Sequence, residues 1–547
     1  VCDECNPNCQ GVVVDAVYVH WYSGNTYDFY RNYFGRDSID NKGMDIISLV
    51  RYCPTDNNCH FENAFWDPNE KIMVYGEGFS RAEDVVAHEL THGVTNHESN
   101  LFYYAQSGAI NESLSDVFGE FVQQSNPAGT VTPATRWLIG EDLEGDELVR
   151  SMSNPPLFRS PDRMKSPYYH LDKTDSYGVH INSGVNNKAA YLIVDGGTFN
   201  GRTVAPLGLE KTAQIYYRVQ TSFLTSGSDY FDLYNALNQS CQDLIGTAGI
   251  NAADCQSVRN ATEAVEMNQE PLPGLTSKVA QCSAGQRVDR TLFSDNFEFG
   301  DSQWNKSKKI GDIDWDFSPL LAASGKYALQ GFAADKTTDF SAFMASGVTL
   351  PANAQLWFKH AFTFETTHSE HYDGGVLEYS TNGGSIWQDA GPLFAQGKDY
   401  GGALYLGNPL AGRKAFVGES LGYVSSRYDL SSLAGKNVQF RWRVGTDLTV
   451  TTKGWFVDDV SIHSCTADTL SVPAAPTNLV AAPGNTSVSL AFNAPASNGG
   501  AAITGYSATC SSAAGVKAAY GATSPITVNG LANKQAYSCV VYALNRI

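Results

Sequence analysis

The chain has 547 residues, a length that predicts several domains rather than one. Its 57 Asp and Glu residues outnumber its 37 Lys and Arg residues, giving a formal net charge of -20. This charge disfavours nucleic-acid binding, because attraction to phosphates needs a basic face. No apolar run reaches the ~18 residues of a membrane-spanning helix. The 42% apolar residues suffice for packed cores, and 17% charged residues with 50 Gly and 28 Tyr are typical of a secreted, strand-rich protein.

Eleven cysteines, mainly through their spacing, indicate an oxidising compartment. Eight of them form four candidate disulfide pairs: Cys53–Cys59, Cys241–Cys255, Cys282–Cys465 and Cys510–Cys539. The remaining Cys2, Cys5 and Cys9 fit an N-terminal segment that has lost a partner. A zinc knuckle is the alternative for this cluster, but a four-ligand structural site would need another Cys or His nearby.

The composition changes along the chain and predicts three folded regions. Residues 1–268 read first as strands and then as helices. A linker over 269–282 leads to residues 283–466, where alternating runs and Gly-rich turns predict an all-β sandwich. A second Pro-containing linker, 467–476, precedes the short strands of residues 477–547.

The motif His88-Glu89-Leu90-Thr91-His92 carries the clearest chemical signal. On a helix, His88 and His92 lie four residues apart on one face and can share a metal ion. Glu89 lies next to that face, within reach of a water molecule at the metal. The alternative is a surface helix with two solvent-facing histidines.

The stretch from Gly108 to Phe118 has a helical apolar stripe and two acidic residues on another face. A zinc hydrolase needs a third protein ligand and an open fourth position, and Glu112 can supply that ligand. Asp116, one turn further on, can accept the second ring N–H of a zinc histidine and fix its tautomer. Seen alone, this pair could equally be a solvated acidic face.

Residues 15–267 resemble the thermolysin family of secreted neutral metalloproteases. The resemblance rests on the two helical motifs above, on shorter matches such as Asn63-Ala64-Phe65-Trp66, and on Gly178 to Gly184. Nineteen residues separate His92 from Glu112, as in that family, whereas zinc aminopeptidases with the same ligands have a shorter spacing. Metzincins are excluded, because they would need Gly and His where Thr95 and Glu98 stand.

The resemblance implies an α+β catalytic domain with one catalytic Zn²⁺. By this resemblance His88, His92 and Glu112 bind the zinc. Glu89 acts as the general base that takes a proton from the attacking water and passes it to the leaving amine. Asp116 and Asn111 are expected to lie next to the zinc ligands without binding the zinc themselves.

The resemblance also implies the groups that hold the substrate. Tyr103 and His180 are expected to donate hydrogen bonds to the oxyanion, with Asp175 orienting His180. The peptide main chain is expected to be held by Asn63, the Ala64 backbone and Arg150. The apolar side chain after the cleaved bond is expected to contact Val85, Ile139 and Val149.

Only some of the acidic residues that bind calcium in the family are present in this sequence. Asp84 and Glu141 match, but Gln123 and Leu138 stand where the family has acids. We therefore expect Ca²⁺ in this domain, in at most one well-formed site.

Both ends of the chain are expected to be truncated. The sequence begins at Val1 with no initiator Met and no signal segment, inside the family's N-terminal lobe. It ends at Ile547, shortly after a strand-like run. The missing targeting signals therefore say nothing about location.

The two later regions resemble known β modules. Residues 283–466 resemble MAM-like jelly-roll modules, and residues 477–547 resemble a fibronectin type III module whose last strand is cut off. Four jelly-roll carboxylates are candidate ligands of a further Ca²⁺, with turn capping as the alternative: Asp295, Glu298, Asp373 and Asp459. Both modules are expected to act as spacers or to bind an extracellular polymer or matrix ligand.

These features predict a secreted, monomeric zinc endopeptidase that acts on proteins and peptides at large apolar residues. An adhesion or matrix-binding protein with a vestigial protease domain is one alternative, and the intact zinc ligands and base argue against it. A zinc aminopeptidase is the other, and the spacing to Glu112 disfavours it.

Overall fold

The computed structural model describes residues 14–54, 61–129, 131–143, 150–272, 278–300, 302–467, 471–512 and 515–545. The chain divides into two units. The first comprises Val1–Gln281 and Arg290–Ser464, and the second comprises Cys282–Asp289 and Cys465–Ile547. Within the ranges described, no helix combines the length and the apolar character needed to cross a bilayer.

The first unit begins with a long helix and a small sheet. Helix α1 is Val14–Phe34, and the sheet has the order β1-β3-β2 (Ser48–Leu49, Ile72–Tyr75 and Ala64–Asp67). Strand β3 pairs in parallel with β1 and antiparallel with β2. Strand β2 is therefore an edge strand of this sheet.

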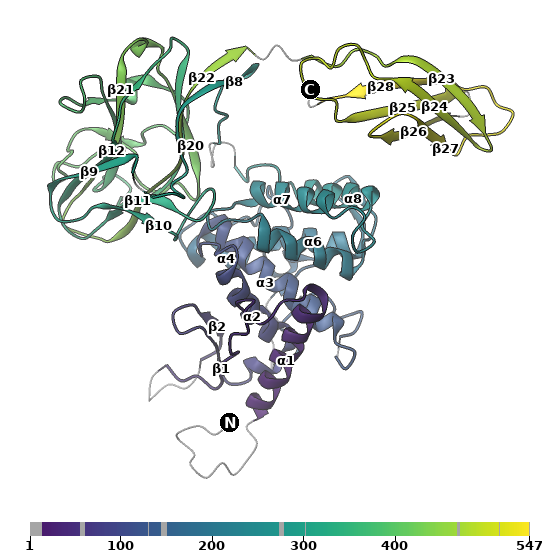
Figure 1. Ribbon diagram of the computed structural model, residues 1–547. Coiled ribbons are helices and arrows are strands. Elements are labelled where there is room, and N and C mark those ends of the chain that lie inside the picture. The colour runs from purple at the N-terminus through teal and green to yellow at the C-terminus, as the bar shows by residue number, and fades with distance from the viewer. Residues whose placement is uncertain are drawn as a thin grey trace. The chain divides into compact units, whose positions relative to one another are not determined.

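Helices α2 (Glu83–His97) and α3 (Ala105–Ser125) pack together in the centre of the helical region (Figure 1). Both are buried over almost their whole length, because other elements cover them on several sides. Glycine allows their close approach. A Cβ at Gly119 on α3 would lie 2.8 Å from the backbone oxygen of Asp84 on α2.

Further helices and two short hairpins complete this region around one hydrophobic core that extends to Met267. The hairpins are β4–β5 (Leu138–Ile139 and Arg150–Ser151) and β6–β7 (Gly197–Phe199 and Arg202–Val204). The helices are α4 (Asp175–Asn182), α5 (Gly184–Asp195), α6 (Leu209–Ser222), α7 (Tyr230–Asp243) and α8 (Ala252–Ala264). Capping boxes begin α7 at Asp229 and α8 at Asn251, and the Cys241–Cys255 disulfide joins these two helices.

A second core of the first unit lies between two antiparallel sheets. One sheet has the order β10-β11-β22-β14-β20-β17: Trp315–Ser318, Ala328–Ala333, Thr452–Ala467, Ala354–Thr363, Val424–Asp429 and Phe394–Gly397. The other has the order β16-β15-β21-β12-β9: Gln388–Asp389, Gly374–Ser380, Asn437–Thr446, Thr338–Met344 and Trp304–Ile310. Large aromatic side chains, including Trp315, Trp442 and Trp455, fill the space between the sheets. The predicted all-β region is therefore confirmed.

The second unit holds two three-stranded antiparallel sheets around a small core. Their orders are β23-β24-β27 (Thr477–Gly484, Ser487–Asn493 and Ile526–Asn529) and β26-β25-β28 (Gly515–Gly521, Gly505–Ser512 and Ser538–Leu544). The rings of Phe492 and Tyr506 lie 4.8 Å apart in this core. Cys510 and Cys539 are register partners on β25 and β28 and form a disulfide.

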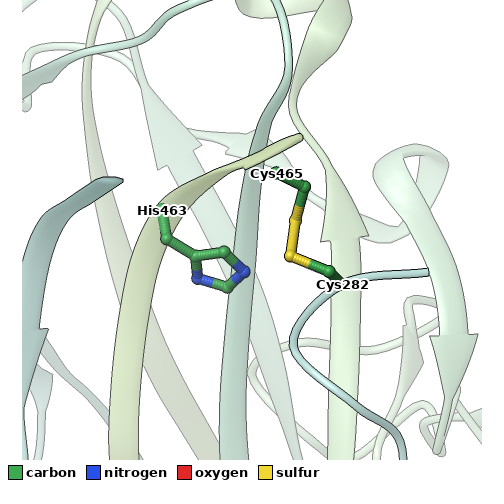
Figure 2. A group of neighbouring side chains, drawn as sticks. All are labelled: Cys282, His463 and Cys465. Carbon is green, nitrogen blue, oxygen red and sulfur yellow. A yellow bond between two sulfur atoms is a disulfide. The ribbon is translucent and has the colours of Figure 1, made fainter. Parts of the chain in front are cut away.

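The Cys282–Cys465 disulfide closes a loop of 183 residues, and the imidazole of His463 lies next to it (Figure 2). This group has the composition of a metal site, but both sulfurs are used in the S–S bond. His463 Nε2 donates to the carbonyl of Gln281 (3.0 Å), and its Nδ1 accepts from the Ser461 hydroxyl (3.0 Å). Burial lowers the pKa of His463, so the ring stays neutral with both nitrogens bonded.

Three of the four predicted disulfides are confirmed: Cys241–Cys255, Cys282–Cys465 and Cys510–Cys539. Cys53 is disulfide-bonded, but its expected partner Cys59 lies outside the described residues, as do Cys2, Cys5 and Cys9. The jelly-roll and fibronectin type III assignments stay predictions.

Gly119→Ala should lower the free energy of unfolding of the helical region by about 1–3 kcal/mol, since a backbone oxygen cannot move out of the way of the new methyl group. Urea unfolding of the full chain, followed by the helical circular dichroism signal, measures this change. Gly24→Ala on α1 is the control, because its Cβ meets nothing within 4 Å. It should raise stability by about 0.5–1 kcal/mol. An unaffected Gly119→Ala protein would contradict the close packing of α2 on α3.

Candidate active site

His88 and His92 on α2 and Glu112 on α3 bring three ligand atoms together. The two Nε2 atoms are 2.9 Å apart, and they lie 3.5 and 3.3 Å from the nearer carboxylate oxygens of Glu112. Ligands of a tetrahedral zinc ion are about 3.3 Å from one another. The Oε2 atom of Glu112 is buried without a hydrogen-bond partner. The donor set and its spacing therefore fit one zinc ion.

Hydrogen bonds behind the ligands hold both imidazoles in one tautomer. His88 Nδ1 lies 2.9 Å from Asp116 Oδ1, and His92 Nδ1 lies 2.8 Å from Asn111 Oδ1. The Asn111 amide nitrogen donates to the Leu101 carbonyl (3.1 Å), which turns its oxygen toward His92. Both Nδ1 atoms are therefore donors, so both Nε2 lone pairs face the shared centre.

Asp116 connects the metal ligands to other parts of the fold. Its fully buried carboxylate accepts two hydrogen bonds from the Arg150 guanidinium (2.8 and 2.7 Å) and one from the Asn187 amide (2.7 Å). Burial opposes the charge, but Arg150 and His88 lower the pKa of Asp116 to about 2. The carboxylate therefore stays ionised and bonded to His88 throughout the neutral range.

Glu89 occupies the position expected for a base. It is 6% exposed and lines the same cleft as the three ligands. Burial raises the pKa of Glu89, while the neighbouring His88 and His92 oppose this rise. A carboxylate with a raised pKa is suited to taking up a proton and giving it away again.

The expected oxyanion donors lie next to each other at the zinc ligands. Tyr103 Oη lies 3.0 Å from His180 Nε2 and donates to Glu112 Oε1 (2.5 Å). The Asp175 carboxylate bonds His180 Nδ1 (2.5 Å) and accepts from the His180 backbone N–H (3.0 Å). A left-handed turn at the start of α4, from Asp175 to Gly178, brings this carboxylate back onto the helix.

The site opens into a cleft of about 720 Å³. Most of the expected substrate contacts line it: Asn63, Ala64, Val85, Ile139 and Arg150. Val149 lies outside the described residues. The Ala64 N–H is bonded by the Asn63 side chain (2.9 Å), so in this structure that donor is occupied within the chain.

Leu143 also lines the cleft and was not expected from the sequence. It is a buried apolar residue in a mostly acidic stretch, two residues after Glu141. Its position among the acidic residues of 141–147 was the only available signal in the sequence. With Val85 and Ile139 it forms an apolar wall.

The expected calcium pair, Asp84 and Glu141, lies close to Glu120 on α3, because the charges of both carboxylates act on the pKa of Glu120. Burial raises the pKa of Asp84 to about 6 and that of Glu141 to about 8, and it raises the pKa of Glu120 well above its usual range. Glu141 Oε2 and Glu120 Oε1 have no hydrogen-bond partner. Among the described residues, however, no three carboxylates here have oxygens within 4.8 Å of one another.

The four carboxylates of residues 283–466 expected around a second calcium are not gathered in one place. Asp295 accepts from a tryptophan indole (2.8 Å), and Glu298 accepts from two backbone N–H groups (2.7 Å each). Asp459 accepts from a serine hydroxyl (2.7 Å) and pairs with a lysine (2.9 Å). Only Asp373 joins an acidic cluster, with two residues that the sequence did not single out. The expected grouping is not found among the described residues, because the other three carboxylates are bonded to separate parts of the sandwich.

Known families match the same part of the chain. Residues 6–96 match "Thermolysin metallopeptidase, catalytic domain", and residues 99–267 match "Thermolysin metallopeptidase, alpha-helical domain". These ranges contain all three zinc ligands, the base and the oxyanion donors.

Individual proteins are similar over the same region. A zinc metalloproteinase of Renibacterium salmoninarum is 44% identical over 245 residues, which are 42% of this chain and 43% of that protein. An extracellular elastase of Staphylococcus epidermidis is 43% identical over 244 residues, or 43% of each chain. The solved structure of the protealysin precursor of Serratia proteamaculans is 30% identical with a TM-score of 0.38, covering 48% of this chain and 81% of that one. The chain thus spans less than half the length of these two curated relatives.

Residues 6–96 and 99–267 are therefore similar to the catalytic and α-helical domains of thermolysin-like metallopeptidases, and their described part holds a candidate zinc site. A region of several antiparallel β sheets follows them.

Asp116→Asn should weaken zinc binding about 10- to 100-fold, because the amide no longer holds His88 in its Nδ1–H tautomer as a carboxylate does. Competition with a chromophoric chelator measures the affinity. Asp45→Asn makes the same charge change at an exposed position and should leave zinc affinity unchanged. Equal zinc affinity in the two variants would contradict the role assigned to Asp116.

Proposed function

We propose that this chain is a secreted zinc endopeptidase that hydrolyses internal peptide bonds of extracellular proteins. The observation that carries this proposal is the convergence of three zinc ligands, a buried base and two oxyanion donors in one cleft. Each group alone has structural explanations, but only a hydrolytic site needs all of them at one place.

His88, His92 and Glu112 would hold the zinc ion, which would supply Lewis acidity to polarise the scissile carbonyl and to acidify a water molecule. Glu89 takes the proton of the attacking water onto its carboxylate and then delivers it to the leaving amine. Burial raises the pKa of Glu89. The pKa of its carboxylate therefore lies closer to that of the group whose proton it takes up, which favours the transfer. Tyr103 and His180 donate hydrogen bonds to the oxygen that becomes negative, and Asp175 keeps His180 facing it.

Strand β2 supports binding of the substrate as an extended chain. It lies at the edge of its sheet, and its residues Ala64 to Trp66 line the cleft together with the preceding Asn63. An edge strand can bond the main chain of a peptide laid beside it. Arg150 is held by Asp116 from behind, so its remaining donors can reach a substrate carbonyl.

Val85, Ile139 and Leu143 support a preference for a large apolar residue after the cleaved bond. All three are buried at the wall of the cleft. An aliphatic or aromatic substrate side chain would remove its own surface from water there, whereas a charged one would lose its hydration.

The extracellular location of the protein is proposed from its relatives and its disulfides. The elastase of Staphylococcus epidermidis is described as extracellular, and three disulfides are typical of an oxidising compartment. We propose that the jelly-roll and fibronectin-like modules bind a matrix polymer or act as spacers, that the protein is a monomer, and that Asp84 and Glu141 contribute to a calcium site.

An adhesion protein with a vestigial protease is the alternative from another class. Loss of activity in such proteins leaves gaps in the catalytic set, but every expected catalytic residue is present here. An aminopeptidase would need acidic groups that hold a free amino terminus. The apolar residues along the cleft wall do not provide them.

Glu89→Gln should retain zinc and lose activity about 100- to 10,000-fold, because the amide cannot carry the proton. Hydrolysis of casein and the zinc content of the same sample measure both quantities. Glu210→Gln, at an exposed position on α6, is the control and should keep full activity. Near-normal hydrolysis by the Glu89→Gln protein would overturn the mechanism.

A peptide blocked at both ends should be cleaved, and leucine or phenylalanine after the cut should give at least about tenfold higher kcat/KM than aspartate. Mass spectrometry of the products locates the cleaved bond. Cleavage that occurs only with a free amino terminus would favour an aminopeptidase. Zinc binding without cleavage of either peptide would favour the adhesion protein.

A further inference from the structure

Three acidic side chains meet at one end of the jelly-roll sandwich. Glu365 follows strand β14, Asp373 directly precedes β15, and Asp447 directly follows β21. Gly374 and Gly445 are register partners on β15 and β21, so the flanking residues Asp373 and Asp447 emerge side by side. Each of the three carboxylates offers an oxygen, and these oxygens lie within 4.8 Å of one another.

Asp373 is the central member of this cluster. Its side chain is 0% exposed. One carboxylate oxygen accepts the Asp447 backbone N–H (2.9 Å), and the other is buried without any hydrogen-bond partner. A buried carboxylate oxygen that lacks a partner is rare in folded proteins and calls for a compensating group.

No positive side chain compensates this cluster. Among the residues that the structure describes, no ion pair reaches Glu365, Asp373 or Asp447, although Thr449 donates to Glu365 (3.1 Å). Burial and the nearby charges of Asp447 and Glu365 raise the pKa of Asp373 to about 7. Three carboxylates without a cation repel one another at neutral pH.

Other buried acids of the same sandwich do have partners. Asp339 pairs with the Arg443 guanidinium through two bonds of 2.6 Å, and Glu378 pairs with Arg413 (2.5 Å) and with Arg441. Asp458, which is also fully buried, accepts from three backbone N–H groups. The cluster at Asp373 therefore differs from these three acids, because none of its members has an ion pair among the described residues and one buried oxygen of Asp373 has no hydrogen-bond partner.

We propose that Glu365, Asp373 and Asp447 bind a calcium ion. All the ligand atoms are carboxylate oxygens, which suit a hard cation and not zinc. Two oxygens on opposite sides of a calcium ion are up to about 5 Å apart, whereas magnesium requires about 4 Å and a stricter geometry. The three oxygens lie within 4.8 Å of one another, so one calcium ion can reach all of them.

The bound ion would tie together two segments that are distant in sequence. Asp373 and Asp447 are 74 residues apart, and the segment after Asp447 carries the 73% exposed Leu448. Few apolar contacts can hold such a segment in place. Calcium would therefore stabilise this end of the sandwich, independently of the peptidase activity.

Calorimetric titration of the full chain with calcium tests the site. Asp373→Asn and Asp447→Asn should each bind one equivalent less than the wild-type protein, and Asp316→Asn, at an exposed position on β10, should bind the wild-type number. Each variant is compared with the wild-type protein, so calcium ions bound elsewhere in the chain do not affect the difference in the number of bound ions. Two separate variants cover the case in which one of them fails to fold.

Scanning calorimetry provides a second readout. In calcium-free buffer Asp373→Asn should melt at or above the wild-type temperature, because the variant removes a repelled charge. Calcium should raise the melting temperature of the wild-type protein and should raise it less in the variant. An equal number of bound calcium ions in all four proteins, or an equal rise in melting temperature, would overturn the proposal.

Discussion

The hydrogen bond between His88 Nδ1 and the Asp116 carboxylate joins the two helices on which the active site is built. Asp116 lies on α3, and its other bonds reach Arg150 on β5 and Asn187 on α5. One buried negative charge thus orients a candidate zinc ligand, holds the Arg150 guanidinium at the cleft and fastens a third helix. The Asp116 carboxylate is buried among these donors, and they lower its pKa although burial opposes the charge. It therefore stays ionised at neutral pH.

This bond depends on the spacing of residues along both helices. His88 and His92 lie one turn apart on α2, and Glu112 and Asp116 lie one turn apart on α3. The two turns can face each other only if the helices approach closely, which Gly119 permits at the crossing. Periodicity, glycine placement and a buried charge therefore act together. A change in any one of them would displace the ligand atoms.

The sequence predicted the site well where its residues are close in sequence or follow a known spacing. His88 and His92 are one turn apart on α2, and Glu112 and Asp116 are one turn apart on α3, so helical periodicity places each pair on one face. Glu89 follows next to the first pair, whereas Asn111 was expected from the family resemblance. Tyr103, His180 and Asp175 needed the family resemblance, since nothing in their local pattern distinguishes them from packed residues. The left-handed turn that places Asp175 shows only in the structure.

Prediction failed where contacts are formed by loops far apart in the chain. Leu143 reaches the cleft from a loop with no periodic pattern. The acidic cluster in the two-sheet sandwich combines Asp373 with Asp447, 74 residues away, because β15 and β21 are neighbours in the sheet. Strand order is a property of the tertiary fold, and composition alone does not specify it. The same reason explains why Asp295, Glu298 and Asp459 could not be separated from Asp373 beforehand.

The most direct test of the central claim is X-ray absorption spectroscopy at the zinc edge on the full chain loaded with one equivalent of zinc. The account predicts a first shell of nitrogen and oxygen only, at about 2.0–2.1 Å, with the outer-shell scattering of two imidazoles. That spectrum should lose imidazole scattering in a His92→Ala protein. A sulfur shell at about 2.3 Å would place zinc on cysteines and contradict the account.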